Sequence, residues 1–274
     1  MELAKLARIF PGLILAACSS AAIPPPPQVI ELPKSVGSGR GVDLPTDASD
    51  VLNELKENRV DFVARYYRTT ESRWPALSAS EARRLSALGL KIVAVWESRS
   101  RYPTHFFYLS GYSDAMAAYW QARAVGQPAG SAIYFAVDFN AQALAPVDEY
   151  FRGIAAGFAA ASGGNPDYTI GVYGSGAVCD AVKRAGLAQY SWLSNSIAWT
   201  DSIGYEDWNI RQGGRLPELS FNHDSDEAKE EYGAFRLADP RVATANNAGG
   251  PSNPIAPRSS QDEQSLATAA IPQR

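Results

Sequence analysis

Four apolar segments of the chain each run directly into an acidic residue. In residues 131–140, a β-branched and aromatic run ends at Asp138, and the other three segments end at Asp43, Glu97 and Asp224. A continuous apolar run is typical of a strand buried on both faces, as in a parallel sheet. Side chains at the C-terminal ends of parallel barrel strands build active sites. The pattern therefore predicts a pocket lined by carboxyl groups, which can serve as general acids and bases.

Other catalytic patterns find little support. The chain has two histidines, His105 and His223, and no His-Glu-x-x-His spacing. His223 lies beside Asp224 and Asp226, but three possible ligands on one segment are a weak metal signal, and we predict no metal and no cofactor. The segment around Ser175 is not the Gly-x-Ser-x-Gly elbow of serine hydrolases.

Strand-like and helix-like segments alternate along the chain and would position the acids. The strand-like segments are residues 41–44, 61–67, 91–97, 132–139, 168–174, 190–194, 208–212 and 219–224. Helices are predicted over 81–88, 114–125, 147–161 and 176–185, with Ser78 and Ser113 as caps of the first two. This alternation predicts an α/β fold with a single (β/α)₈ TIM-barrel-like domain and degenerate late helices. A doubly wound open sheet is the alternative, although no Gly-x-Gly-x-x-Gly follows the first strand.

Composition divides the 274 residues into four parts. Residues 1–18 combine basic residues, an apolar stretch and a Leu-Ala-Ala-Cys ending, which resembles a lipoprotein signal peptide and lipobox with Cys18 as the lipidated residue. Residues 19–37 form a Pro-rich tether, 38–240 the barrel, and 241–274 a tail predicted to be disordered. We therefore expect an exported lipoprotein of the cell envelope, in the periplasm or at the outer membrane, held to the membrane through its lipid. An apolar N-terminus with an incidental cysteine is the alternative.

The bulk composition suits one sizeable core and excludes one class of partner. Hydrophobic residues make up 46% of the chain and aromatic residues 11%, and the formal net charge is −4 with acids and bases interspersed. No basic stripe of the kind that binds nucleic acid is present in the sequence. We therefore expect no nucleic-acid partner.

Six short motifs spread over residues 38–240 resemble one family. They are Gly41-Val-Asp43, Asp61-Phe-Val-Ala-Arg-Tyr-Tyr67, Gly126-Gln-Pro128, Ile133-Tyr-Phe-Ala-Val-Asp138, Gly171-Val-Tyr-Gly-Ser-Gly176 and Trp208-Asn-Ile-Arg-Gln212. Together they are similar to the bacterial glycoside-hydrolase-like family catalogued as domain of unknown function 1906. That family is related to the family-25 glycoside hydrolases, lysozyme-type muramidases on a (β/α)₈ barrel. The resemblance implies a carbohydrate-binding cleft, with peptidoglycan or another N-acetylated glycan as the partner.

The resemblance also implies which acids would act, with one departure. Asp43, Asp138 and Asp224 match acids of the muramidases, but Asn140 stands where the muramidases have their general-acid glutamate. An amide cannot deliver a proton to a leaving oxygen. Two hypotheses stay open: a glycoside hydrolase that uses another acid, or a catalytically inactive carbohydrate-binding module.

For an enzyme, Asp138 would be the central residue and Glu97 the replacement acid. In a barrel these two side chains end adjacent strands, and like charges close together raise one pKa, which leaves an acid available near neutral pH. Asp43 would orient the sugar or stabilise positive charge. The alternative for Glu97 is a surface acid or a salt bridge with Arg65 or Arg99.

Further residues at strand ends are candidates for holding the substrate. Arg65 could bind a carboxylate in the pocket through a bidentate pair, or serve as a barrel-end ion pair. Aromatic faces can stack on sugar rings and amides can bond to hydroxyls, although aromatic residues are also ordinary core material. The candidates for substrate binding are Arg65, Tyr66, Asn140, Tyr173, Trp192, Trp208 and Gln212.

Overall fold

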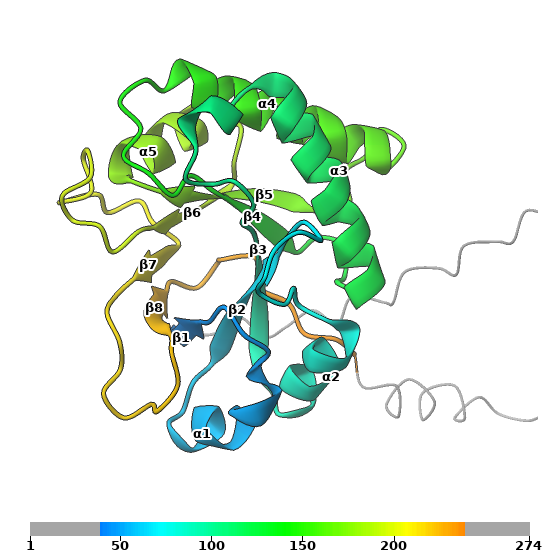
Figure 1. Ribbon diagram of the computed structural model, residues 1–274, viewed down its shortest axis with the longest axis vertical. Helices are drawn as coiled ribbons and strands as arrows, with labels where there is room; N and C mark the ends of the chain where they lie inside the picture. Colours follow the sequence, from blue (N-terminus) through cyan, green and yellow to red (C-terminus); the bar gives the residue numbers. More distant parts are fainter. Residues whose placement is uncertain (1–38, 239–274) are drawn as a thin grey trace, which may run out of the picture.

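The protein folds into a closed barrel of eight strands in sequential order, in a computed structural model that describes residues 39–238 (Figure 1). The strands are β1 (Gly39–Asp43), β2 (Phe62–Tyr67), β3 (Lys91–Trp96), β4 (Ala132–Ala136), β5 (Thr169–Gly174), β6 (Tyr190–Leu193), β7 (Ile210–Gln212) and β8 (Asp224–Ala228). Neighbours from β1 to β7 pair in parallel. The barrel prediction is confirmed and the open sheet is wrong. The predicted signal peptide with Cys18, the tether and the tail lie outside the described residues.

In residues 39–238, an α-helix follows each of the first five strands and none of the later ones. The helices are α1 (Leu52–Glu57), α2 (Ala79–Ala87), α3 (Tyr108–Val125), α4 (Ala145–Ala161) and α5 (Gly176–Arg184), with two 3₁₀ turns, η1 (Ala48–Asp50) and η2 (Pro103–His105). Between β6 and β8 the described chain forms loops without a helix. The late helices are therefore degenerate, as predicted. None of the described helices is long and apolar enough to cross a membrane.

Local signals placed most helix ends. Ser78 accepts a hydrogen bond from the Glu81 backbone amide, as the predicted cap requires, and Gly126 ends α3 with a φ of 86°. The predicted start of α3 is wrong, because the helix begins six residues earlier, at Tyr108, and no side chain caps it. Its early start packs it against α4: a Cβ on Gly111 would lie 1.9 Å from the Tyr150 carbonyl oxygen.

The last strand runs opposite to the direction predicted for it. The expected strand over 219–224 is wrong; β8 begins at Asp224 and pairs antiparallel with both β7 and β1. In this register Asp224 lies opposite Asp43. Because β8 is reversed, its first residue lies at the same barrel end as the last residues of the other strands. Asp224 therefore lies at the predicted end of the barrel, although it begins its strand and does not end it.

Aromatic side chains fill the barrel interior and close it below its mouth. Phe62, Tyr134, Tyr190 and Trp192 are buried there in one apolar cluster. The Phe62 ring occupies the space beside Gly41, where a Cβ would lie 2.1 Å from a ring carbon. Side chains that point inward at the C-terminal ends of the strands therefore lie on top of this packed apolar cluster.

Candidate active site

The mouth of the barrel holds a pocket lined by the four acids singled out in the sequence. Asp43 ends β1, Glu97 directly follows β3, Asp138 lies two residues beyond β4, and Asp224 begins β8. All four line one cavity of about 220 Å³. Tyr66, Tyr173, Trp192 and Gln212 line the same cavity. The structure therefore brings together eight of the predicted site residues from every part of the barrel.

Asp43 lies at the centre of a hydrogen-bond network across the mouth. The Tyr66 hydroxyl donates to one of its carboxyl oxygens at 2.5 Å, and Gln212 Nε2 donates to the other at 2.8 Å. Gln212 Oε1 in turn accepts from the Tyr173 hydroxyl at 3.0 Å. Burial raises the pKa of Asp43 to about 7, helped by the charges of Asp224 and Glu97 and opposed by the bonds from Tyr66 and Gln212. Near neutral pH this carboxyl group is therefore divided between its two protonation states.

A fifth acid, Asp226, lies one step deeper than Asp224 on β8. In register it stands opposite Gly41 of β1 and Gln212 of β7. It is 4% exposed, and neither of its carboxyl oxygens has a hydrogen-bond partner among the described residues. Burial and then the neighbouring Asp43 raise its pKa well above the usual range. Sequence reasoning assigned Asp226 no role beyond a weak metal signal, although its two-residue spacing from Asp224 predicts that both face inward.

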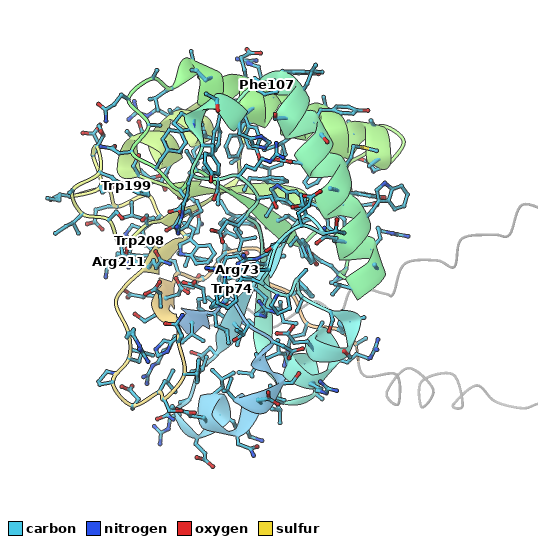
Figure 2. All side chains as sticks on the ribbon, in the orientation of Figure 1. Arg73, Trp74, Phe107, Trp199, Trp208 and Arg211 are labelled. Atoms are coloured by element: carbon cyan, nitrogen blue, oxygen red, sulfur yellow. The ribbon has the colours of Figure 1, made fainter. Side chains whose placement is uncertain are left out.

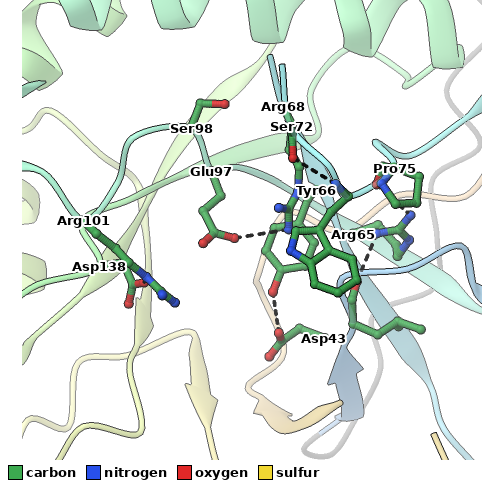
Figure 3. Close-up of polar contacts among 12 residues, drawn as sticks. Asp43, Arg65, Tyr66, Arg68, Ser72, Pro75, Glu97, Ser98, Arg101 and Asp138 are labelled. Atoms are coloured by element: carbon green, nitrogen blue, oxygen red, sulfur yellow. Dashed lines mark hydrogen bonds and ion pairs between the residues drawn. The ribbon is translucent and has the colours of Figure 1, made fainter. Parts of the chain in front are cut away.

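Glu97 and Asp138 are each paired with an arginine (Figure 3). Arg68 Nη2 lies 3.4 Å from Glu97 Oε2, and Arg101 Nε donates to Asp138 Oδ2 at 2.5 Å. Burial raises the pKa of Glu97, and the charge of Asp138 adds to the rise while Arg68 and Arg101 oppose it. The ion pair that was the alternative to a catalytic role for Glu97 is present, but its partner is Arg68 and not Arg65 or Arg99. Sequence reasoning missed Arg68 and Arg101, because both lie in loops after the strand ends where no periodic signal places a side chain.

A second cavity, of about 440 Å³, extends the pocket toward the loops that follow β2, β3 and β7. It shares Asp43, Tyr66, Glu97, Arg101 and Asp224 with the inner pocket. The two cavities together form one cleft, and we call the larger one its outer half. Across the described residues, no group of three or more His, Cys, Asp or Glu side chains is arranged to hold a metal ion.

The cleft is not lined by three of the predicted substrate-binding residues, Arg65, Trp208 and Asn140. Arg65 is fully buried and points out of the barrel, where it pairs with Glu81 at 2.5 Å and donates to the Leu44 carbonyl oxygen at 3.0 Å. Successive residues of a strand point to opposite faces, so Arg65 must face outward when Tyr66 faces inward. Trp208 lies before β7 beside Arg211, whose guanidinium is 4.8 Å from its ring centroid (Figure 2). Neither side chain lines the cleft, which corrects both predictions.

A model of the Rv2525c-like, glycoside hydrolase-like domain matches residues 53–247. The chain belongs to this family. The resemblance inferred from the six motifs is thereby confirmed.

Two Bacillus subtilis proteins and a solved structure from Mycobacterium tuberculosis are similar to this glycoside hydrolase-like domain. Bacillus subtilis YbfG is 35% identical over 123 residues, which cover 43% of the chain and 17% of YbfG. B. subtilis FadG is 28% identical over 166 residues, which cover 57% of the chain and 28% of FadG. The chain thus matches less than a third of either relative. The crystal structure of the Mycobacterium tuberculosis Tat-secreted protein Rv2525c in complex with HEPES has a TM-score of 0.58 at 20% identity, covering 73% of this chain and 99% of Rv2525c.

Asn140 of this glycoside hydrolase-like domain serves the loop after β6 instead of the cleft. Its side-chain oxygen accepts hydrogen bonds from the Thr200 backbone amide and from the Thr200 hydroxyl, both at 2.9 Å. Asn140 does not line either cavity of the cleft, which corrects its predicted role in substrate binding. The residue at the position of the missing glutamate therefore has a structural task.

Proposed function

We propose that the domain hydrolyses a glycosidic bond of cell-wall glycan, peptidoglycan or another N-acetylated glycan. The observation that carries the proposal is the pair Glu97 and Asp138 in one pocket. Glycoside hydrolysis needs a protonated and an ionised carboxyl beside the scissile bond. Glu97, whose pKa is raised by burial, fits the first role, and Asp138, whose charge is balanced by Arg101, fits the second.

In the proposed reaction Glu97 gives its proton to the glycosidic oxygen as the bond to the anomeric carbon breaks. Asp138 stabilises the positive charge that develops on the sugar ring, and the sugar's own acetamido oxygen can act as the nucleophile in N-acetylated glycans. Water then adds to the anomeric carbon and its proton returns to Glu97. The aromatic rings of Tyr66 and Tyr173, which line the pocket, offer faces on which a sugar ring can stack.

The second candidate is a binding module without catalysis, and Asn140 favours it. Asn140 stands where the muramidases that this family resembles have their proton donor. Its side-chain amide oxygen instead accepts two hydrogen bonds from Thr200. A cleft can keep its aromatic and polar walls after losing its acid. The buried acids favour chemistry, since burying a carboxyl group without a hydrogen-bond partner costs free energy.

One experiment separates the two candidates. The full chain is incubated with purified peptidoglycan, and new reducing ends are measured for the wild type, Glu97→Gln, Asp138→Asn and the control Glu149→Gln on α4, which is an exposed acid outside both cavities of the cleft. We expect wild type and control to release fragments, and Glu97→Gln to lose roughly 10²- to 10⁴-fold in rate, the usual contribution of a general acid. Sedimentation with the glycan but no fragments from the wild type would leave the binding module standing.

We also propose that the protein is exported and held at the envelope by a lipid on Cys18. The lipobox-like ending at residues 15–18 supports this, and Ser19 after the cysteine favours the outer membrane. Rv2525c, a protein of the same family, is Tat-secreted. Cys18→Ser should abolish processing and shift the protein out of the membrane fraction. An unchanged membrane fraction for that variant would contradict the proposal.

A further inference from the structure

The outer half of the cleft is lined by four arginines and by three acids, and the proposed chemistry uses only part of this positive charge. Four arginines line it: Arg68 after β2, Arg99 and Arg101 after β3, and Arg215 in the loop between β7 and β8. Arg68 pairs with Glu97 and Arg101 pairs with Asp138. These two arginines therefore balance acids of the inner pocket.

The other two arginines of the outer half have no acidic partner within the described residues. No hydrogen bond or ion pair of the Arg99 guanidinium to any of these residues is found, and Arg99 is exposed. Arg215 donates to the Phe221 carbonyl oxygen at 2.8 Å and forms no ion pair. Burial raises the pKa of Asp224, and the charges of His223 and Arg215 oppose that rise. Most of the donors of both guanidinium groups are thus free for a ligand.

The loop that carries Arg215 is held in place by a buried histidine. His223 accepts a hydrogen bond from the Leu216 backbone amide at Nε2, and its Nδ1 lies 2.9 Å from the Phe221 carbonyl oxygen. Because Nε2 accepts the bond from Leu216, Nδ1 is the nitrogen that donates to the Phe221 carbonyl oxygen. The Phe221 carbonyl oxygen thus joins His223 to Arg215, which orders the arginine before any ligand arrives.

Two exposed aromatic residues, Trp74 and Tyr102, also line the outer half. Trp74 is 38% exposed and Tyr102 is 64% exposed, and they come from the loops after β2 and β3. Trp74 carries the guanidinium of Arg73 at 5.0 Å from its ring centroid, and the two are labelled together in Figure 2. Aromatic faces of this kind suit sugar rings. The outer half therefore offers surfaces for a sugar next to donors for an anion.

We propose that the outer half of the cleft binds a carboxylate substituent of the glycan through Arg99 and Arg215, so that the substrate is an acidic glycan. The inference rests on the proposed function and narrows its substrate class. Guanidinium groups match a carboxylate with two parallel hydrogen bonds, a geometry that lysine or a neutral amide cannot reproduce. A neutral glycan would leave both arginines without an anionic partner.

The division of charge also sets the direction in which the glycan lies. Asp138 lines only the inner pocket, and Asp43, Glu97 and Asp224 line the boundary that the two halves share. These four acids would repel a carboxylate placed over them. The arginines without acidic partners lie in the outer half. The sugar at the scissile bond therefore sits over the acids as a neutral ring, and its acidic neighbour or substituent lies toward the loops after β3 and β7.

The test compares one glycan with and without its carboxylates. Purified peptidoglycan is used as isolated and after carbodiimide amidation of its carboxyl groups, and chitin serves as a neutral N-acetylated glycan. Cosedimentation on ice and release of reducing ends are measured for the full-length wild type, Arg99→Gln, Arg215→Gln, the double variant and the control Arg83→Gln. Arg83 is an exposed arginine on α2 outside the cleft, and the control removes the same charge.

We expect the wild type and Arg83→Gln to bind untreated peptidoglycan at least roughly tenfold more tightly than the amidated form, as for a charge-assisted hydrogen-bonded pair. The double variant should lose this preference while its affinity for the amidated glycan stays unchanged. Equal binding of both forms by the wild type, or a preference that survives in the double variant, would overturn the inference. If amidated peptidoglycan or chitin is cleaved as fast as untreated peptidoglycan, the proposed hydrolysis is supported but the role of Arg99 and Arg215 in binding a carboxylate is wrong. No binding or cleavage of any glycan would reject both.

Discussion

The Asp43 carboxyl group should make the protein less stable as the pH rises, and Asp43→Asn should remove that effect. Its pKa is raised from 3.8 to about 7 in the folded protein. Between about pH 4 and pH 7 the folded state therefore binds more protons than the unfolded state, and the free energy of unfolding falls as the pH increases. Each pKa unit corresponds to about 1.4 kcal/mol, so the loss reaches about 4 kcal/mol by about pH 8.

The substitution keeps the shape of the side chain but changes its hydrogen bonds. The two carboxyl oxygens accept from the Tyr66 hydroxyl and from Gln212 Nε2, and an asparagine oxygen can replace only one of these acceptors. The lost bond costs about 1–2 kcal/mol. Asp43→Asn should therefore be about 1–2 kcal/mol less stable than the wild type near pH 4, and about 2–3 kcal/mol more stable near pH 8. The gain increases if the neutral amide of the variant also relieves the raised pKa of Asp226.

Urea-induced unfolding followed by circular dichroism, repeated from about pH 4 to about pH 8, measures both curves. Asp50→Asn, at an exposed acid of η1, is the control and should run parallel to the wild type. We expect the Asp43→Asn curve to cross the wild-type curve. Parallel curves, or a variant that is less stable than the wild type throughout, would refute it. A crossing would also show that Asp43 lowers stability at neutral pH, as is common for residues kept for function.

Three further substitutions test the fold around the cleft, all by urea-induced unfolding. Glu81→Ala leaves the fully buried Arg65 without its counter-charge and should cost about 3–5 kcal/mol; a loss below about 1 kcal/mol would contradict the buried pair. Gly41→Ala places a Cβ 2.1 Å from the Phe62 ring and should cost about 1–3 kcal/mol or more, and a second change, Phe62→Leu, should restore part of the loss. Asn140→Ala removes two hydrogen bonds to the loop after β6 and should cost about 1–3 kcal/mol, with faster proteolysis of that loop; unchanged stability would show that those bonds are not needed.

The difference between Arg65 and Tyr66 marks the boundary of what a motif can predict. Both lie in one strand segment, and the motif predicted both as ligands of the substrate. The alternation of side chains along β2 sends Tyr66 to Asp43 and Arg65 to Glu81. Which of the two faces is the cleft depends on the register with β1 and β3. A local pattern contains the alternation but not its phase relative to the barrel.

The barrel could be predicted from the sequence because strand and helix signals are local: apolar runs, a cap at Ser78 and a left-handed glycine at residue 126 depend only on neighbouring residues. The position of acidic residues at the ends of four apolar segments could also be predicted from the sequence. Three features could not be predicted without the folded structure: the direction of β8, the arginine partners of Glu97 and Asp138, and the burial that raises the pKa of Asp43. These properties arise from segments far apart in the chain, and both Coulomb energy and desolvation depend on distances and burial that exist only once the barrel has closed.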